Sequence, residues 1–425
     1  MAGVLFTLGV VYFVAHALAL SFSRTRIPDV LVLMGLGIIA GPWLHVVELS
    51  MFGQVGRVLT TLALAAILFE SGTSLDLRAM WRSARVTTVL TFATSAATIA
   101  LVTGVAVALL DFGWLPAALL GTILCGTSSA VVIPMVQALA PGEEAGTALI
   151  LESALTDVLC IVFTFGLLQA AGQGDVQVGH VVGQTLASLV FAALIGVAGG
   201  VAWLRVWDWV RDLPNTTFST IAASLVFYGV TEALGFSGAI AVLAFGLTLA
   251  NHETMGLARL VAQPAGTTVT PEEQRFYREV VFLLKTFFFV YLGISMRFDD
   301  ARGFGVAAAI VAAVYLARAG IARRVAPPHY ARRDVALMSV MVPKGLAAAV
   351  LAGLPLQQGL AEGATIQSVT FAVVLLSIVV TALAVPFVGR GPATPAVAPV
   401  APVAPVAPVA PVARDPGEAA DTREG

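Results

Sequence analysis

The sequence predicts an all-α polytopic membrane protein with about 13 transmembrane helices. Of its 425 residues, 58% are hydrophobic and only 11% are charged, whereas soluble domains carry about 25% charged residues. The mean hydropathy is +0.93, and apolar runs of about 20 residues, long enough to cross a bilayer, recur along the chain. The composition excludes an ordinary soluble protein, and no basic run suited to nucleic acid is present.

We expect the spans at 2–20, 27–44, 57–75, 86–110, 115–140, 146–170, 179–204, 215–233, 236–251, 277–297, 303–325, 334–354 and 364–388. Together they form one transmembrane domain over residues 1–390. Residues 391–425 differ, because Ala-Pro-Val repeats favour an extended polyproline conformation without a core. We expect a disordered Ala/Pro/Val-rich cytoplasmic tail there.

The basic residues predict the orientation. With the N-terminus outside, the cytoplasmic connections hold most of the arginines, as the positive-inside rule requires. These are Arg24, Arg26, Arg78, Arg82, Arg85, Arg205, Arg211, Arg259, Arg275, Arg278, Arg323, Arg324, Arg332 and Arg333, against Arg57, Arg297 and Arg302 on the other side. We therefore expect an integral protein of the bacterial inner membrane with a cytoplasmic C-terminus.

Thirteen spans fit two inverted six-helix repeats joined by a linking helix at 179–204. In that plan the fifth and twelfth spans correspond, and both are interrupted, by Gly-Thr-Ser-Ser at 126–129 and by Pro-Lys-Gly at 343–345. Broken helices at matching positions point to an ion site near the bilayer midplane. The alternative is that these glycines and the proline are ordinary residues of transmembrane helices.

The sixth span contains two carboxylates, Glu152 and Asp157. A charge at that depth costs about 2.5–3.5 kcal/mol on insertion scales, so it normally faces a water-filled pathway. Ser153 and Asp157 share one helix face, whereas Glu152 lies about 140° round the helix from Asp157. We therefore expect separate roles: Asp157 and Ser153 offer hard oxygen ligands for sodium, lithium or potassium, and Glu152 needs another partner.

Three cations within apolar runs are candidates to neutralise Glu152, because a buried charge is tolerated only when paired. They are Arg318, Lys344 and Lys285. For Lys285, snorkelling or a structural ion pair is as good an explanation as a functional role. Glu70, near the end of the third span, either lines a cytoplasmic funnel or is an interfacial carboxylate.

The two cysteines, Cys125 and Cys160, lie in apolar segments. We expect small packing residues there rather than a disulfide.

The run Glu-Ser-Ala-Leu-Thr-Asp at 152–157 resembles the Glu-Ser-x-x-Asn-Asp motif of monovalent cation:proton antiporters, the sodium/proton exchanger family. The segments at 35–42, 68–72 and 235–241 are also similar to motifs of that family, in the same order. The resemblance covers roughly residues 1–390. It implies the sodium/proton antiporter fold with crossed discontinuous helices, a homodimer in the bilayer and no cofactor. It also implies a secondary transporter, not an enzyme, that exchanges Na⁺, or alternatively Li⁺ or K⁺, for H⁺.

The resemblance also implies roles for individual residues. Asp157 matches the ion- and proton-binding aspartate, Ser153 a side-chain ligand and Thr127 a ligand from the unwound fifth helix, so these three would hold the cation. The remaining expected site residues are Thr156 and Ser128 beside the ion, Glu152 and Arg318 as a structural ion pair, and Lys344, Glu70 and Lys285 as accessory residues. Dimerisation helices are expected at about 1–75 and 215–297, and core helices at about 86–170 and 303–388.

Two departures from the family pattern keep alternatives open. Thr156 stands where electroneutral exchangers have Asn and electrogenic ones a second Asp. Thr-Ser-Ser at 127–129 replaces the usual Thr-Asp-Pro and is similar to the crossing of glutathione-gated potassium efflux proteins, which makes potassium efflux the alternative function. With one free carboxylate, proton and cation compete for Asp157, and the exchange is expected to be electroneutral. An intramembrane hydrolase, for which no suitably placed histidine is found, and a non-transporting sensor are the alternatives of another class.

Overall fold

The structure is a computed structural model that describes residues 28–45, 53–74, 84–171, 178–211, 218–257, 271–298 and 300–388, with a few isolated positions between these ranges. Within them every regular element is helical, which confirms the predicted all-α class. Almost all of the predicted first span, 2–20, and the whole predicted tail, 391–425, lie outside the described residues.

The helices are α2 (Asp29–Ile38) with the π-helical turn η1 (Ile39–Trp43), α3 (Gly53–Ser74), α5 (Ala84–Leu110), α6 (Trp114–Ile123), α7 (Ser129–Leu139), α8 (Glu143–Ala171), α9 (Val178–Arg211), α10 (Ser219–Ala233), α11 (Gly238–Asn251), α12 (Pro271–Ile294), α13 (Ala301–Val325), α14 (Arg332–Val340), α15 (Leu346–Leu351), α16 (Gly353–Gln357) and α17 (Gly363–Val388). Five stretches of the described helices are long and apolar enough to cross a membrane: Arg85–Leu110, Glu143–Leu168, Ala187–Trp207, Ala301–Val325 and Gly363–Val388. Several other predicted spans are shorter helices or pairs of half-helices.

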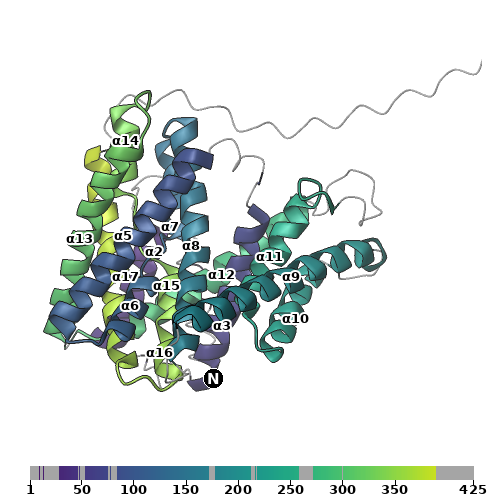
Figure 1. The fold of residues 1–425 in the computed structure, drawn as a ribbon, viewed down its shortest axis with the longest axis horizontal. Helices are drawn as coiled ribbons and strands as arrows, with labels where there is room; N and C mark the ends of the chain where they lie inside the picture. The colour runs from purple at the N-terminus through teal and green to yellow at the C-terminus, as the bar shows by residue number, and fades with distance from the viewer. Residues whose placement is uncertain are drawn as a thin grey trace, which may run out of the picture.

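The described helices pack as two groups (Figure 1). One group contains α2, α3 and α9 to α12, and the other contains α5 to α8 and α13 to α17. In Figure 1, α13 and α14 lie at one edge of the molecule and α9 to α11 lie at the other. The groups meet where α8 contacts α9 and α11, where α15 contacts α3 and where α17 contacts α2. That the chain forms a dimer, and that the first group mediates it, both stay predictions.

Facing glycines bring the helices of the first group close together. A Cβ atom on Gly246 of α11 would lie 2.6 Å from the carbonyl oxygen of Phe69 on α3, and one on Gly72 of α3 would clash with Leu243 of α11. Gly37 and Gly293 form a matching contact between α2 and α12. In a bilayer, close packing of small residues replaces the hydrophobic effect as the force between helices. Gly37 and Gly41 of the 35–42 motif therefore have a packing role, whereas a Cβ atom on Gly35 would meet no atom within 4 Å.

The two predicted helix breaks are present and cross each other. The fifth predicted span consists of α6 and α7, separated by residues 124–128, and the twelfth consists of α14 and α15, separated by residues 341–345. Pro343 lacks an N–H group and disfavours a helical conformation at the residue before it. The N–H of Ser128 donates to the carbonyl oxygen of Pro343 at 2.8 Å, and the N–H of Lys344 donates to Ser377 Oγ at 2.8 Å. These bonds satisfy backbone groups that unwinding would otherwise leave unpaired in an apolar medium.

The same contacts recur around each broken helix. α5 packs on α6 and α8, and α13 packs on α14 and α17, while α5 and α13 also pack on each other. This arrangement is the one expected of two structural repeats whose broken helices cross at the centre. It brings α8, which carries both intramembrane carboxylates, directly against the crossing.

Candidate functional site

The candidate site lies where α8 passes the crossing of the broken helices. Glu152 and Asp157 are both buried there, with 0% and 9% of their surfaces exposed. The two residues nevertheless have different surroundings, because the helical twist over five residues directs them to different neighbours.

Glu152 is held by Arg318 of α13. Arg318 donates from Nη1 to Glu152 Oε1 at 2.8 Å and from Nη2 to Oε2 at 2.9 Å, which is a bidentate pair. Its other donors reach Thr94 Oγ1 on α5 at 2.9 Å and the carbonyl oxygen of Met338 on α14 at 2.8 Å. The guanidinium is completely buried. One cation therefore joins α5, α8, α13 and α14 and neutralises Glu152.

Asp157 faces the other way and has no arginine or lysine partner among the described residues. Ser129, the first residue of α7, donates from Oγ to Asp157 Oδ2 at 2.9 Å. Asp157 and Ser129 line a small cavity whose opposite wall is α3, including Leu68 and Ser71. The carboxylate therefore lies at the boundary between the two helix groups, beside the N-terminus of a half-helix.

The unwound segment before α7 is attached to α8 by Thr156. The N–H of Thr127 donates to Thr156 Oγ1 at 2.9 Å, and the same hydroxyl donates to the carbonyl oxygen of Ser153 at 3.1 Å. Thr127 Oγ1 in turn approaches Glu152 Oε1 at 3.5 Å. The Thr156 hydroxyl therefore connects the broken helix to α8, whatever further part it takes in ion binding.

The structure does not bring Ser153 into a hydrogen bond with Asp157. Ser153 shares the helix face, but its hydroxyl donates to the carbonyl oxygen of Ile150 at 2.8 Å. A serine inside a helix competes for such carbonyl groups of the preceding turn. Ser128 lines the cavity, and within the described part of the chain its buried hydroxyl has no hydrogen-bond partner. In this geometry, Ser129 is the hydroxyl that meets Asp157.

Lys344 lies in the break of the twelfth span and is 1% exposed. No atom of the described residues accepts a hydrogen bond from its Nζ. Charges that act on it include Glu152 and Arg318, and it acts in turn on Asp157. The structure therefore places a second buried cation near both carboxylates without pairing it to either.

Lys285 and Glu70 lie away from the crossing. Lys285 of α12 pairs with Asp29, the first residue of α2, at 3.2 Å, and both side chains are mostly buried. Glu70 of α3 is influenced by the charges of Lys285 and Arg278. Glu70 does not line the small cavity with Asp157, although its neighbour Ser71 does.

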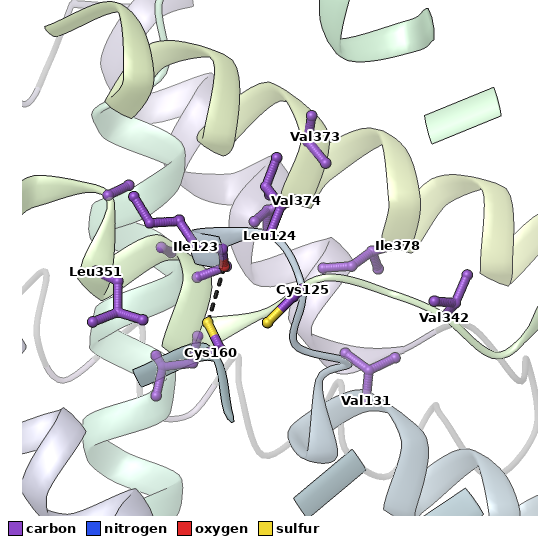
Figure 2. Close-up of a cluster of buried hydrophobic side chains, with 14 of the residues drawn as sticks. Ile123, Leu124, Cys125, Val131, Cys160, Val342, Leu351, Val373, Val374 and Ile378 are labelled. Atoms are coloured by element: carbon purple, nitrogen blue, oxygen red, sulfur yellow. Dashed lines mark hydrogen bonds between the residues drawn. The ribbon is translucent and has the colours of Figure 1, made fainter. Parts of the chain in front are cut away.

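The two cysteines pack beside the break of the fifth span (Figure 2). Both are free and fully buried. Cys160 Sγ donates to the carbonyl oxygen of Ile123, the last residue of α6, at 3.0 Å. Figure 2 shows Cys125 and Cys160 among Val131, Val342 and Ile378, so the region behind the site is a packed apolar core.

The donors at the crossing suit a monovalent cation better than a multivalent one. No group of three or more His, Cys, Asp or Glu side chains that could hold a metal ion occurs among the residues described. The groups near Asp157 are one carboxylate, hydroxyls and backbone groups at the ends of half-helices. Such oxygen donors with a single negative charge bind hard cations of low charge.

Three contacts at these sites were not anticipated from the sequence: Ser129 to Asp157, Thr94 to Arg318, and Asp29 to Lys285. Each joins residues that are 28 to 256 positions apart in the chain. Ser129 carries a signal in the sequence, since it belongs to the Gly-Thr-Ser-Ser interruption at 126–129. Asp29 and Thr94 stand at a helix start and within a Thr-rich helix, where these residue types are ordinary.

The Glu152–Arg318 pair predicts a large stability effect. Replacing either residue singly, with Glu152→Leu or Arg318→Met, leaves the other charge buried and should cost about 3–5 kcal/mol. The double variant should recover most of this loss, because no buried charge remains. The measurement is the temperature at which the detergent-solubilised protein loses its monodisperse peak.

Arg302→Met is the matched control, because the ion pair of Arg302 with Asp111 is exposed and should be worth about 0–1 kcal/mol. If Arg318→Met and Arg302→Met lowered the unfolding temperature equally, the result would contradict a structural role for the buried pair.

The crossing predicts a compensating pair of substitutions. A Cβ atom on Gly345 would clash with Oγ and Cβ of Ser128, so Gly345→Ala should lower the unfolding temperature by forcing the crossing segments apart. Ser128→Gly removes both clashing atoms, and the double variant should therefore be more stable than Gly345→Ala alone. The same thermal assay checks this, and failure of Ser128→Gly to rescue Gly345→Ala would contradict the observed contact.

The fold and the site geometry agree with comparisons to known proteins. The structure of the sodium proton antiporter MjNhaP1 from Methanocaldococcus jannaschii at pH 8 superposes with a TM-score of 0.69 at 19% sequence identity, covering 91% of this chain and 97% of that one. This likeness confirms the predicted antiporter fold.

Curated relatives align over most of the chain. The K(+)/H(+) antiporter NhaP2 of Shewanella sp. (strain MR-4) is 25% identical over 383 residues, which cover 87% of this chain and 63% of the relative. The Na(+)/H(+) antiporter NhaS2 of Synechocystis sp. (strain ATCC 27184 / PCC 6803 / Kazusa) is 25% identical over 288 residues, which cover 67% of this chain and 50% of that protein. The chain therefore spans less than two thirds of the length of these relatives. The family model described as "Sodium/hydrogen exchanger, transmembrane" matches residues 9–391, and the chain belongs to this family of integral membrane proteins.

Proposed function

We propose that this protein is a secondary antiporter, not an enzyme, that exchanges a monovalent cation for protons at Asp157. The observation that carries the proposal is the difference between the two carboxylates of α8. Glu152 is neutralised by a bidentate arginine, whereas Asp157 has no cationic partner among the described residues and lines a cavity between the helix groups. Asp157 is thus the group whose charge a proton or a cation has to neutralise.

The surroundings of Asp157 support binding of either ion. Without a cation, the Ser129 hydroxyl donates to the carboxylate. When a cation arrives, rotation of this hydroxyl turns a lone pair towards the ion, so the same two side chains become ligands. Thr127 and Ser153 are the further proposed ligands, with Ser128 and Thr156 beside them. At the same crossing, the negative ends of the half-helices α6 and α14 favour positive charge, and the positive ends of α7 and α15 favour negative charge.

Lys344, Lys285 and Glu70 have accessory roles in this proposal. Lys344 is a buried cation whose Nζ has no hydrogen-bond acceptor among the described residues, so it supplies positive charge at the crossing near Asp157. Lys285, paired with Asp29, keeps α2 against α12. Glu70, on which the charges of Lys285 and Arg278 act, is the proposed acid of the cytoplasmic funnel.

Alternating access follows from the place of the cavity. Its walls come from α3 on one side and from α7, α8 and α15 on the other, so they belong to different helix groups. Sliding one group against the other would expose Asp157 first to one side of the membrane and then to the opposite side. In this proposal α5 to α8 and α13 to α17 form the moving core of a homodimer in the bacterial inner membrane, with the N-terminus outside.

Sodium is the proposed cation, and potassium is the second candidate. The relatives include proteins named for each of the two exchanges. What favours potassium is the crossing itself, where Ser128 and Ser129 supply hydroxyls instead of a second carboxylate. Sodium is hydrated more strongly than potassium, and a site with fewer negative charges offsets less of the free energy needed to remove that water.

Asp157→Asn should abolish proton flux driven by a sodium or potassium gradient in proteoliposomes, because the neutral amide carries no exchangeable proton and no negative charge for a cation to neutralise. Asp157→Glu should keep part of the activity. The measurement is dequenching of a pH-sensitive dye on addition of each alkali cation.

The matched control is Glu232→Gln. Glu232 is exposed and accepts a hydrogen bond from the N–H of Gly238, which a glutamine oxygen can also accept. Persistent exchange in a folded Asp157→Asn protein would sink the assignment of Asp157.

One exchangeable carboxylate predicts electroneutral exchange of one cation for one proton. Exchange rates in proteoliposomes should then stay the same within error when the membrane potential is clamped at different values with an ionophore for an ion that the protein does not transport. Sodium, lithium and potassium are tested separately, so that the same experiment ranks the cations. A rate that changes several-fold with the clamped potential would exclude 1:1 stoichiometry.

A further inference from the structure

A groove outside the candidate site runs between α13 and α14 and reaches Val388, the last residue of α17. It has a volume of about 520 Å³. Tyr315, Leu316, Ala319 and Arg323 line it from α13, at spacings that belong to one face of that helix. The face that α14 contributes consists of Arg332, Val335, Ala336, Ser339 and Val340.

The groove is basic at one end. Arg323 is in the last turn of α13, Arg332 is the first residue of α14, and Tyr330 lies in the connection between the two helices. Neither guanidinium has an ion pair or hydrogen bond with the described residues. The two carboxylates that act on Tyr330 are already engaged, Glu144 with His329 at 2.9 Å and Asp334 with the N–H of Gly142 at 3.2 Å. This end therefore offers two arginines to an anion.

The rest of the groove is apolar. Its deeper polar side chains are satisfied internally: Tyr315 OH donates to the carbonyl oxygen of Ser377 at 2.7 Å, and Ser339 Oγ donates to that of Val335 at 2.8 Å. Leu316, at 76% exposure, forms part of the wall. From Arg332 to Val340 the helix rises about 12 Å, which is close to the thickness of one hydrocarbon leaflet, about 15 Å. The groove thus has a charged end at a helix terminus, and its length along α14 is close to the thickness of one leaflet.

We infer that this groove binds one anionic phospholipid, with its phosphate on Arg323 and Arg332 and an acyl chain along the apolar faces of α13 and α14. Arginine recognises phosphate with bidentate hydrogen bonds, and basic pockets between transmembrane helices suit anionic headgroups. A lipid is the matching occupant because one wall is a face of α13, a stretch long and apolar enough to span a membrane. A zwitterionic lipid fits the apolar body equally well but lacks the net charge that the arginines neutralise.

Occupancy would bear on the transport site through α14. This half-helix ends at Val340, next to the broken segment 341–345 whose Pro343 accepts the hydrogen bond from Ser128. A lipid packed along α14 therefore stabilises one arm of the crossing. An effect of the lipid on transport rests on the proposed function, whereas lipid binding to the groove does not.

The test is lipid binding to the purified full-length chain, followed by native mass spectrometry and by thermal stability in detergent. Phosphatidylglycerol and phosphatidylcholine with identical acyl chains are compared. We expect the wild type to retain phosphatidylglycerol preferentially and to show a rise in unfolding temperature only with that lipid. Arg323→Gln combined with Arg332→Gln should weaken phosphatidylglycerol binding about 30-fold, since each basic residue contributes about 1 kcal/mol near anionic lipid.

Two controls separate this site from general surface charge. Arg324→Gln removes a neighbouring exposed arginine that does not line the groove and should leave binding unchanged. Ala336→Phe fills the apolar body without altering charge and should reduce binding, whereas Ala312→Phe, on an exposed position of α13 outside the groove, should not.

The proposal would be overturned if Arg324→Gln weakened phosphatidylglycerol binding as much as Arg323→Gln combined with Arg332→Gln does. Equal binding of the two lipids by the wild type would also overturn it. Capture of an acidic peptide in place of lipid, blocked by Arg323→Gln but not by Ala336→Phe, would overturn it as well. The two proposals fail separately. A variant that loses its lipid preference but still exchanges cations normally contradicts only the lipid proposal. An Asp157→Asn protein that still exchanges cations and binds lipid as the wild type does contradicts only the antiport proposal.

Discussion

The bidentate pair between Glu152 and Arg318 is the interaction on which the rest of the crossing depends. Both side chains are completely shielded from solvent, so either charge alone would cost several kcal/mol in this environment. Every remaining donor that Arg318 uses reaches a different helix, Thr94 on α5 or Met338 on α14. The two broken helices and the helices that flank them are therefore positioned relative to a single buried charge pair.

That arrangement leaves Asp157 with a different environment five residues further along α8. Its contacts are a hydroxyl at the start of a half-helix and a small cavity that faces α3. The bonds around it join backbone to hydroxyl, as between Thr127 and Thr156, and add no charge. In the proposed mechanism, the rigid pair of Glu152 and Arg318 therefore has a structural role, and Asp157, whose partners can be replaced, is the exchange site.

The sequence predicted the features that depend on composition and local pattern. The all-helical class and both helix breaks followed from apolar run length and from Gly126 and Pro343, and the helical angle between Glu152 and Asp157 indicated separate partners. Partners far apart in the chain were harder to predict. The sequence offers three cations as partners of Glu152 and gives no sign that Asp29 pairs with Lys285, because choosing among distant charges requires the helix packing. Helical periodicity points to Ser153, because it describes neighbours on one helix, and it gives no sign of Ser129, which meets Asp157 across the crossing.

Thr156 links the geometry to the number of charges moved. Its hydroxyl accepts from the N–H of Thr127 and donates to the carbonyl oxygen of Ser153. An ionised aspartate at this position could accept the first bond but could not make the second, and it would add a negative charge beside Glu152 and Asp157. Arg318 already satisfies Glu152 with both terminal nitrogens, so the added charge would need Lys344, whose Nζ has no hydrogen-bond partner in the described residues. With threonine in place, the neutral hydroxyl holds the unwound segment and leaves Lys344 without a hydrogen-bond partner among the described residues. In the proposed mechanism, a single carboxylate therefore carries the exchangeable charge.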